Sequence, residues 1–258
     1  MVFKISPEFK ACEKEIQLIF KNFDVSGDVF IKGERNQIKL FEVQQQKINV
    51  KSFKKPHKLN QLIYRYIRKS KARRSFEFAR ILLKKGIGTP APVAFEENYT
   101  KWGLQKSFYA SIHQNYDLTF RELVEIPDYP DHENILRQFT QFCYKMHQNG
   151  IEFKDHSPGN TLIKNIANQQ YKFFLVDLNR MKFHDFMDME LRMKNLCRLT
   201  PKKEMTDIIA EEYAKLSSEN PERLKNLLWN YTFDFQRKYH KKLYLKNKLK
   251  SFLPKFKS

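Results

Sequence analysis

The stretch that decides the fold is Phe153–Leu162, with the sequence FKDHSPGNTL, followed by the run FFLVDLN at positions 173–179. Together they place Asp155, then Asn160 five positions later, and then Asp177 at the end of an apolar strand. Sites that handle phosphate use this order and spacing for one carboxylate that accepts a proton and two oxygen ligands for a hard cation. We therefore expect these three side chains to form one site.

The three residues suit separate tasks in phosphoryl transfer, which depends mainly on a held metal ion and an oriented nucleophile. Asp155 can accept the proton of a hydroxyl group, while Asn160 offers a carbonyl oxygen and Asp177 a carboxylate to Mg²⁺. Pro158-Gly159 predicts a tight turn that directs Asn160 back toward Asp155. The alternative, three unrelated turn or capping residues, requires all three to match by accident. We expect ATP as the phosphate donor, with Mg²⁺ or Mn²⁺.

A site of this kind also needs a lysine for the phosphates and a glutamate that pairs with it. Lys51 closes INVK within the strand-like run KINVKSF, and Lys54 and Lys55 are near competitors. Glu77 is the only acidic residue of the helical segment that follows, so it is the expected partner of Lys51. The alternative for Glu77 is a surface pair with Arg73, four positions earlier.

The loop that covers the nucleotide is less clear, because the sequence contains no G-x-G-x-x-G. Gly33 lies in a polar turn at 32–36 between two strand-like runs, so the backbone at this hairpin tip can cover the phosphates. A plain surface turn is the alternative. By position alone, the adenine is expected beside the strand Phe108–His113, where backbone groups from Ser111 to His113 can pair with its edge.

Length and pattern predict an α+β protein in two parts. The chain has 258 residues, of which 41% are hydrophobic, enough for a substantial core. The strand-rich part, 1–115, is expected to hold nucleotide, and the helical part, 116–258, is expected to carry catalysis. The expected strands cover 29–31, 38–41, 47–53, 92–95, 104–112 and 171–177. The expected helices cover 8–20, 58–85, 119–125, 133–148, 186–197, 202–217 and 221–240.

Five segments in order resemble the lipopolysaccharide core kinases, the Kdo and heptose kinases of Gram-negative bacteria. These segments are GERNQIKLF, INVKSFKKP, RSFEFARILLKKGIGTPAPVAF, KDHSPGNTLI and FFLVDLNRM, and they cover roughly residues 25–185. The family is distantly related to protein kinases and aminoglycoside phosphotransferases. The resemblance implies a bilobal protein-kinase-like fold: an N-terminal antiparallel sheet lobe with one main helix, and a mainly helical C-terminal lobe. It also implies an ATP- and Mg²⁺-dependent enzyme that phosphorylates a sugar hydroxyl of the inner core.

Matched by motif, Asp155 resembles the catalytic base, Asn160 and Asp177 the metal ligands, Lys51 the phosphate-binding lysine, and Glu77 its partner. The sequence departs from the protein-kinase pattern at two places. FKD replaces HRD, so the arginine before the base is missing, and DLN replaces DFG. The short connection after Asp177 favours a small or glycan acceptor over a protein.

The charge suggests where the protein acts. Lys and Arg number 48 against 29 Asp and Glu, a net charge of +19, which attracts polyanions. The basic, aromatic segment 240–258 can lie on an anionic lipid surface, with a solvated or packed helix as the alternative. No long apolar run or secretory leader is visible, so we expect a cytoplasmic protein, peripheral on the inner membrane, acting on lipopolysaccharide core or a lipid A precursor.

Two other readings stay open. One is a soluble small-molecule kinase of the aminoglycoside phosphotransferase type. The other is a non-catalytic nucleic-acid-binding protein that uses the basic stretch Lys69–Arg74, although the triad of site residues argues against it. The three cysteines are scattered and suggest neither disulfides nor a metal site.

Overall fold

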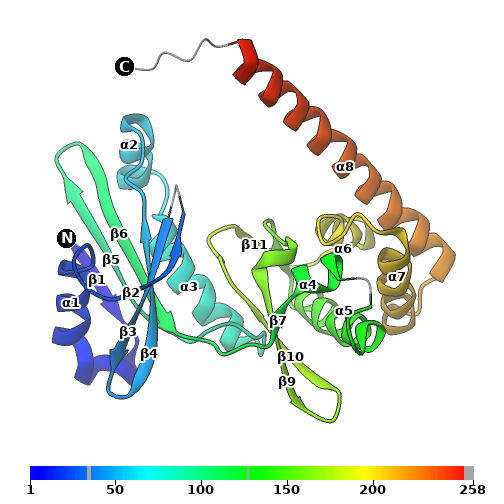
Figure 1. Ribbon diagram of the computed structural model, residues 1–258, viewed down its shortest axis with the longest axis horizontal. Coiled ribbons are helices and arrows are strands. Elements are labelled where there is room, and N and C mark those ends of the chain that lie inside the picture. The colour runs from blue at the N-terminus through cyan, green and yellow to red at the C-terminus, as the bar shows by residue number, and fades with distance from the viewer. Residues whose placement is uncertain (34–35, 127, 253–258) are drawn as a thin grey trace. The chain divides into compact units, whose positions relative to one another are not determined.

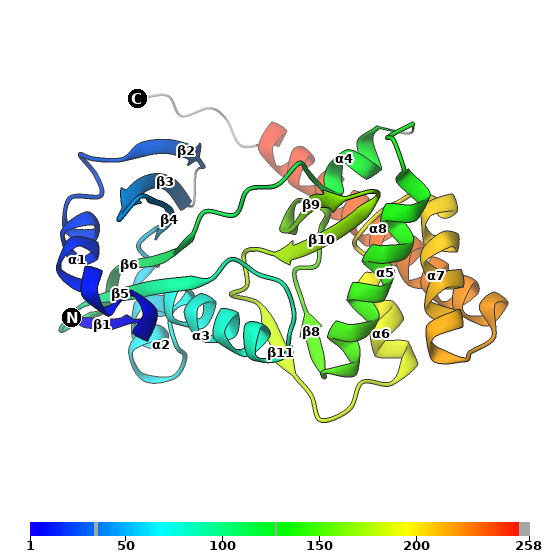
Figure 2. The same cartoon turned by 90° about the horizontal axis from the view of Figure 1, so that it is seen from below.

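The computed structural model describes residues 1–33, 36–126 and 128–252, with side chains up to residue 248. The chain forms two compact units (Figures 1 and 2). Unit 1 contains Met1–Asp117 and Lys172–Met181, and unit 2 contains Leu118–Tyr171 and the chain from Lys182 onward. The predicted α+β class is confirmed, with an antiparallel sheet early in the chain and mainly helices later.

Unit 1 is built on an antiparallel six-stranded sheet in the order β1-β5-β6-β4-β3-β2. The strands are β1 (Val2–Ile5), β2 (Asp28–Lys32), β3 (Asn36–Val43), β4 (Gln46–Phe53), β5 (Pro92–Thr100) and β6 (Gly103–Ile112). The predicted hairpin and third strand are confirmed as β2, β3 and β4. Strand β1, which sequence reasoning missed, pairs with β5.

The helices of unit 1 lie on opposite faces of this sheet. They are η1 (Pro7–Cys12), α1 (Glu13–Lys21), α2 (Lys58–Tyr66) and α3 (Lys71–Lys84). The prediction of one continuous helix over 58–85 is wrong, because α2 ends at Tyr66 and α3 begins at Lys71. The chain breaks after α2, and Ser70 caps α3 by accepting a hydrogen bond from the Arg73 amide at 3.1 Å. Serine at an N-cap satisfies an amide that the helix leaves unpaired, so the cap favours a new start there.

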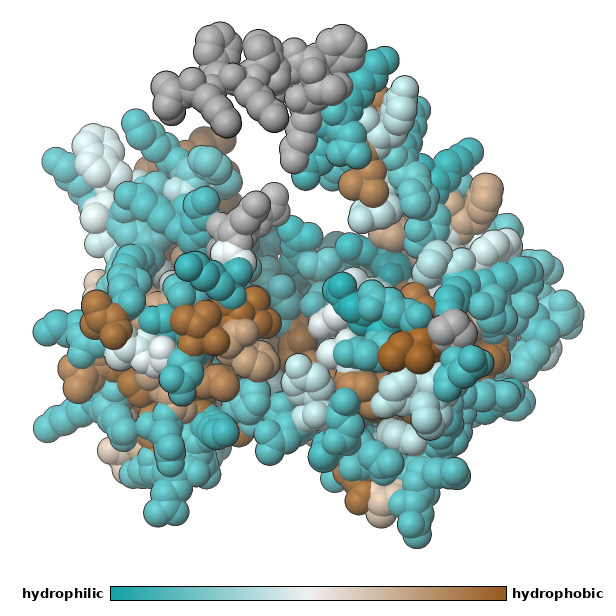
Figure 3. All heavy atoms as spheres, viewed as in Figure 1, coloured by the Kyte–Doolittle hydropathy of each residue, from teal (hydrophilic) through white to brown (hydrophobic). Residues whose placement is uncertain are grey.

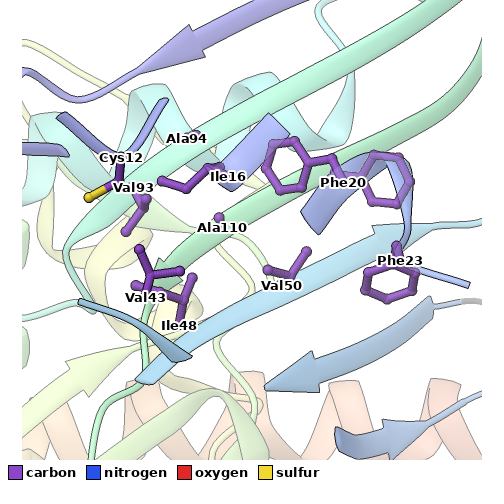
Figure 4. Packing of buried hydrophobic residues seen from close by; sticks show 11 residues of the cluster. Cys12, Ile16, Phe20, Phe23, Val43, Ile48, Val50, Val93, Ala94 and Ala110 are labelled. Carbon is purple, nitrogen blue, oxygen red and sulfur yellow. The ribbon is translucent and has the colours of Figure 1, made fainter. Parts of the chain in front are cut away.

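A hydrophobic core lies between α1 and the sheet (Figure 4). Ile16 and Phe20 of α1 pack against alternate residues of β4, Ile48 and Val50, and Phe20 stacks on Phe108 at 5.4 Å between ring centroids. On the opposite face, residues of α3 pack with Phe53, Phe95 and Tyr109. Because strand residues alternate between faces, Lys51 lies on the α3 face beside Phe53.

Unit 2 is mainly helical. Its helices are α4 (Phe120–Glu125), α5 (His132–Gln148), α6 (Met189–Leu196), α7 (Lys203–Ser217) and α8 (Pro221–Phe252). Short strands occur at β7 (Leu118–Thr119), β8 (Ile151–Phe153), β9 (Thr161–Ala167), β10 (Gln170–Leu175) and β11 (Met181–Phe183), and the unit boundaries fall within β10 and β11. They form the small sheets β10-β9-β7 and β11-β8.

Gly150 ends α5 in a way that no other residue can repeat without strain. Its φ is +70°, and a Cβ there would lie 1.9 Å from the carbonyl oxygen of His184. The predicted stop at Asn149-Gly150 is thereby confirmed. The close approach lets β8 start directly and lead into the loop that carries Asp155.

The last helix, α8, is longer than predicted and continues to Phe252. Its first half packs against α6 and α7, whereas every residue from Arg237 to Lys248 is exposed, and the helix runs clear of the rest of its unit in Figure 1. Hydrophilic side chains dominate the surface of α8 seen in Figure 3. Within the described residues, no helix combines the length and apolarity needed to span a bilayer.

Candidate active site

Lys51 of β4 and Asp177, two of the predicted site residues, form an ion pair in unit 1. The ammonium of Lys51 lies 2.8 Å from Asp177 Oδ1, and only 14% of the lysine side chain is exposed. Lys51 also lies over the ring of Phe53, 5.4 Å from its centroid. Among the three candidate lysines, Lys51 is the one whose strand position directs it to the acidic residue.

The segment before Asp177 is held by the loop that follows α3. The amide of Leu175 donates to the Gly88 carbonyl at 2.9 Å, and the Thr89 hydroxyl donates to the Leu175 carbonyl at 2.7 Å. A Cβ on Gly88 would lie 2.0 Å from the carbonyl oxygen of Phe173, so only glycine permits this approach. Strand β10 therefore ends at a defined point, two residues before Asp177.

Asp177 has a backbone conformation that is uncommon for a residue other than glycine. Its φ is +59°, and Asn179 donates a hydrogen bond from Nδ2 to Asp177 Oδ1 at 2.6 Å. Aspartate tolerates the left-handed region better than most residues, yet such positions carry strain and concentrate at functional sites. The turn directs Oδ1 to both Lys51 and Asn179.

Glu77 does not pair with Lys51, and the predicted ion pair is wrong. Its carboxylate binds Lys69 at 2.7 Å and Arg73 at 2.9 Å. The Arg73 contact is the i,i+4 alternative, which geometry favours because residues four apart on α3 lie on the same face. These two cations hold the pKa of Glu77 below its usual range against the opposing effect of burial.

Cations gather around Asp177 within unit 1. Burial lowers the pKa of Lys71, Asp177 opposes that shift, and the nearby charges of Arg180, Lys51 and Arg74 lower it further. Burial likewise lowers the pKa of Arg74 to about 10, assisted by the positive charge of Arg68. One carboxylate among several cations leaves a local excess of positive charge, which suits phosphate groups.

The proposed nucleotide contacts at Gly33, Ser111 and His113 also lie in unit 1. The amide of Gly33 donates to the Asn36 carbonyl at 3.1 Å, and residues 34 and 35 of the predicted turn lie outside the described residues. Ser111 is buried and pairs in register with Asn49 and Pro92.

The backbone amides at the end of β6 are already used within the protein. Ile112 donates to the Ala91 carbonyl and His113 to the Lys47 carbonyl, at 2.9 and 2.8 Å. These two amides therefore cannot donate to an adenine ring, and that part of the expectation is wrong. The signal that sequence reasoning lacked was the register of β4 and β5 beside β6.

Unit 2 carries the loop with Asp155 and Asn160. The Asp155 carbonyl accepts hydrogen bonds from Asn160 Nδ2 at 2.7 Å and from the Ser157 amide at 2.8 Å. The turn η2 (Pro158–Asn160) closes with a hydrogen bond from the Asn160 amide to the Ser157 carbonyl at 2.9 Å. The predicted return of Asn160 toward Asp155 is confirmed. Because Nδ2 binds the backbone, Oδ1 is the side-chain atom left to bind a cation.

Arg198 contacts this loop and was missed by sequence reasoning. Its Nη2 lies 3.1 Å from Asp155 Oδ1, and its Nη1 donates to the Lys154 carbonyl at 2.7 Å. The residue follows α6, more than forty positions after Asp155, and no local pattern marks it. Only the packing of α6 against β8 brings the two segments together.

His156, next to Asp155, belongs to the core of unit 2. It is fully buried, and its ring lies 5.7 Å from that of Phe139 and 5.4 Å from that of Phe153. Neither ring nitrogen has a hydrogen-bond partner in the structure, and burial lowers the pKa of His156 to about 3. The imidazole is therefore a neutral side chain of the core.

The described residues offer oxygen atoms that suit a hard cation, but they contain no cluster of typical metal ligands. Among the described residues, no group of three His, Cys, Asp or Glu side chains can hold a metal. The free cysteines, Cys12, Cys143 and Cys197, are all buried. Mg²⁺ usually takes one or two protein oxygens and completes its shell with water and phosphate. Asn160 Oδ1 in unit 2 and the Asp177 carboxylate in unit 1 are each, within their own unit, oxygen atoms of that chemical kind.

An antiparallel sheet with one main helix behind its lysine strand, then a helical part with an Asp–Asn loop, defines a kinase-like phosphotransferase. The model of the lipopolysaccharide kinase (Kdo/WaaP) family matches residues 24–225. The chain belongs to this family, and the resemblance drawn from its motifs is confirmed.

A solved structure described as WaaP in complex with acyl carrier protein has the same fold. The likeness has a TM-score of 0.64 at 17% identity, and it covers 93% of this chain and 99% of that chain. No curated protein matches the sequence.

Proposed function

We propose that this kinase transfers the γ-phosphoryl group of ATP to a sugar hydroxyl, of Kdo or heptose, in the lipopolysaccharide inner core. The observation that carries the proposal is that each unit holds its own part of the motif in a defined geometry. Lys51 is bonded to Asp177 at 2.8 Å, and Asn160 is bonded to the Asp155 backbone at 2.7 Å. The family supplies the reaction class, and these residues supply the groups that the reaction needs.

In the proposed reaction, the sugar oxygen attacks the γ-phosphorus as the bond from that phosphorus to ADP breaks. The proton of the hydroxyl passes to the carboxylate of Asp155. Lys51, with the cations around it, neutralises phosphate charge, and Lys51 holds Asp177 in place. Bound Mg²⁺ would neutralise charge on the β- and γ-phosphates, with Asn160 Oδ1 and Asp177 as its protein ligands.

We propose that the enzyme works as a peripheral protein on the cytoplasmic face of the inner membrane, on core or a lipid A precursor. The exposed second half of α8 supports this, since Arg237, Lys238, Lys241 and Lys242 accompany exposed Leu243 and Tyr244. Lysine stems and aromatic rings together favour anionic lipid headgroups. An acyl carrier protein is named with WaaP, and such a carrier is a candidate partner here that copurification would test.

Transfer of label from ATP tests the proposal directly. The protein is incubated with Mg²⁺, γ-labelled ATP and a panel of truncated lipopolysaccharide cores, and the labelled acceptor is identified. We expect label on inner-core acceptors and a loss of at least ~10²-fold in kcat for Asp155→Asn, with ATP binding retained. Asp207→Asn, in an exposed i,i+4 pair with Lys203, is the matched control that should stay active.

Two results would count against the proposal. Label on free sugars or aminoglycosides, and on no lipopolysaccharide core, would indicate the small-molecule kinase instead. Equal loss of ATP binding and turnover in Asp155→Asn would contradict the role of Asp155 as the base.

A further inference from the structure

The arginine that FKD lacks next to the base is supplied from another part of the chain. Arg198 binds two successive residues, the Lys154 carbonyl through Nη1 at 2.7 Å and the Asp155 carboxylate through Nη2 at 3.1 Å. A planar guanidinium fork can fix both the backbone and the side chain of a neighbour, which a single ammonium group cannot do. The contact therefore fixes the point where β8 leads into the loop.

We propose that Arg198 is the positioning residue for Asp155: it holds the carboxylate in the orientation that accepts the substrate proton. This inference rests on the proposed function of Asp155 as the base. Arg198 itself touches no reacting atom, and its effect passes through Asp155.

The solvent exposure of Arg198 and Asp155 indicates that their pairing affects turnover more than folding stability. The Arg198 side chain is 32% exposed and that of Asp155 is 24% exposed, so solvent screens much of their attraction. The pair is thus a weak source of folding stability. Orientation is more demanding, because a misplacement of about 1 Å at a reacting group can lower turnover by about 100-fold.

An aromatic ring of helix α8 also contacts the Arg198 guanidinium. The ring of Phe235 lies 5.3 Å from the Arg198 guanidinium carbon, and Phe235 stacks on Tyr239 at 6.1 Å. Tyr239 is already in the exposed part of α8. A continuous set of contacts therefore runs from the exposed helix to the base, so Phe235 should also support turnover.

Steady-state kinetics on the full chain test this inference. We expect Arg198→Met to lower kcat by ~30- to 100-fold while KM for ATP stays within about twofold. Arg198→Lys keeps the positive charge and loses the planar fork, so its kcat should lie between those of wild type and Arg198→Met. Guanidinium ions at millimolar concentration should restore part of the kcat of Arg198→Ala and none of that of Asp155→Asn. Arg223→Ala, which removes an exposed arginine of α8, is the matched control.

A second pair of variants tests the stacking contact. Phe235→Leu should lower kcat several-fold, whereas Phe233→Leu, on the same helix at a position 58% exposed, should not. Unchanged or raised kcat in Arg198→Met would overturn the inference. An equal loss of kcat in Arg198→Ala with and without guanidinium ions would also overturn it.

Amide hydrogen exchange separates this inference from the proposed function. Without substrate, the amides of Ser157 and Asn160 should exchange faster in Arg198→Ala than in wild type or Arg223→Ala. An inactive wild type would contradict the proposed kinase reaction alone. Unchanged exchange in Arg198→Ala would overturn the positioning role, whatever the activity.

Discussion

The ammonium group of Lys51 binds the carboxylate of Asp177 and lies on the α3 face of the sheet. The glutamate of α3 that could have competed for it, Glu77, is already neutralised by Lys69 and Arg73. Removal of the Lys51 charge should therefore affect the carboxylate of Asp177 and leave the ion pairs of Glu77 intact. This difference can be measured with substitutions that remove one charge at a time.

Lys51→Met should lower kcat/KM for ATP by at least ~100-fold, because the cation proposed to neutralise the phosphates is lost and Asp177 loses its ion pair with Lys51. Glu77→Gln should change kcat/KM for ATP by no more than about twofold, because its pairs are partly exposed surface pairs. Initial rates over a range of ATP concentrations check both values. A loss in Glu77→Gln as large as that in Lys51→Met would show that Glu77 acts on the nucleotide after all.

At the level of secondary-structure elements, a buried histidine connects three helices of unit 2. His147 of α5 lies 3.0 Å from the Tyr213 hydroxyl of α7 and 3.1 Å from Asn195 Oδ1 of α6. Burial lowers the pKa of His147 to about 4, the hydrogen bond that the imidazole donates to Asn195 Oδ1 opposes the shift, and the positive charge of Arg192 adds to it. The imidazole is therefore neutral in the folded protein.

This arrangement predicts a loss of stability in acid. The folded-state pKa lies below the unfolded value of about 6.5, so the unfolded chain binds more protons between pH 6.5 and pH 4. As the pH is lowered through that window, the free energy of unfolding should decrease. The contribution of His147 to this decrease is about 2 kcal/mol between pH 7 and pH 5. Urea unfolding of wild type and His147→Gln checks it. The variant, less stable at pH 7, should lose less between the two pH values. An equal loss in both proteins would contradict the assignment.

Elements with long amphipathic patterns could be predicted from the sequence, and α5 and α7 are examples. The hairpin of β9 and β10 was missed in part, since only the second strand was expected. Its signal was the polar NQQ turn, in which Asn168 and Gln169 have positive φ. The break between α2 and α3 was missed because a basic, polar stretch continues a helical pattern as well as it ends one.

For the whole molecule, the net charge of +19 and the exposed, basic end of α8 both favour an anionic binding partner. Residues 241–258 carry seven lysines and no acidic residue. Near an anionic membrane each basic residue contributes about 1 kcal/mol before screening. Apolar side chains such as Leu243 and Leu245 can add burial at the headgroup boundary.

Removal of residues 241–258 should lower partition to vesicles rich in anionic lipid by at least ~10-fold, with no such effect on neutral vesicles. Sedimentation with vesicles of each composition measures it. Lys241→Gln/Lys242→Gln should lose part of the binding. Lys14→Gln/Lys21→Gln on α1, with the same change in charge, should lose little. Equal partition of the truncated and full chains would contradict the membrane role of α8.

The sequence by itself determined the α+β class, the family and the local Asp155–Asn160 loop, because these depend on spacing within one segment and on periodic apolar residues. Only the tertiary structure decided that Lys51 pairs with Asp177 and not Glu77, that the amides of Ile112 and His113 are engaged, and that Arg198 reaches Asp155. Each of those contacts joins residues far apart in the chain. Their geometry follows from sheet register and helix packing, which no short stretch of sequence specifies.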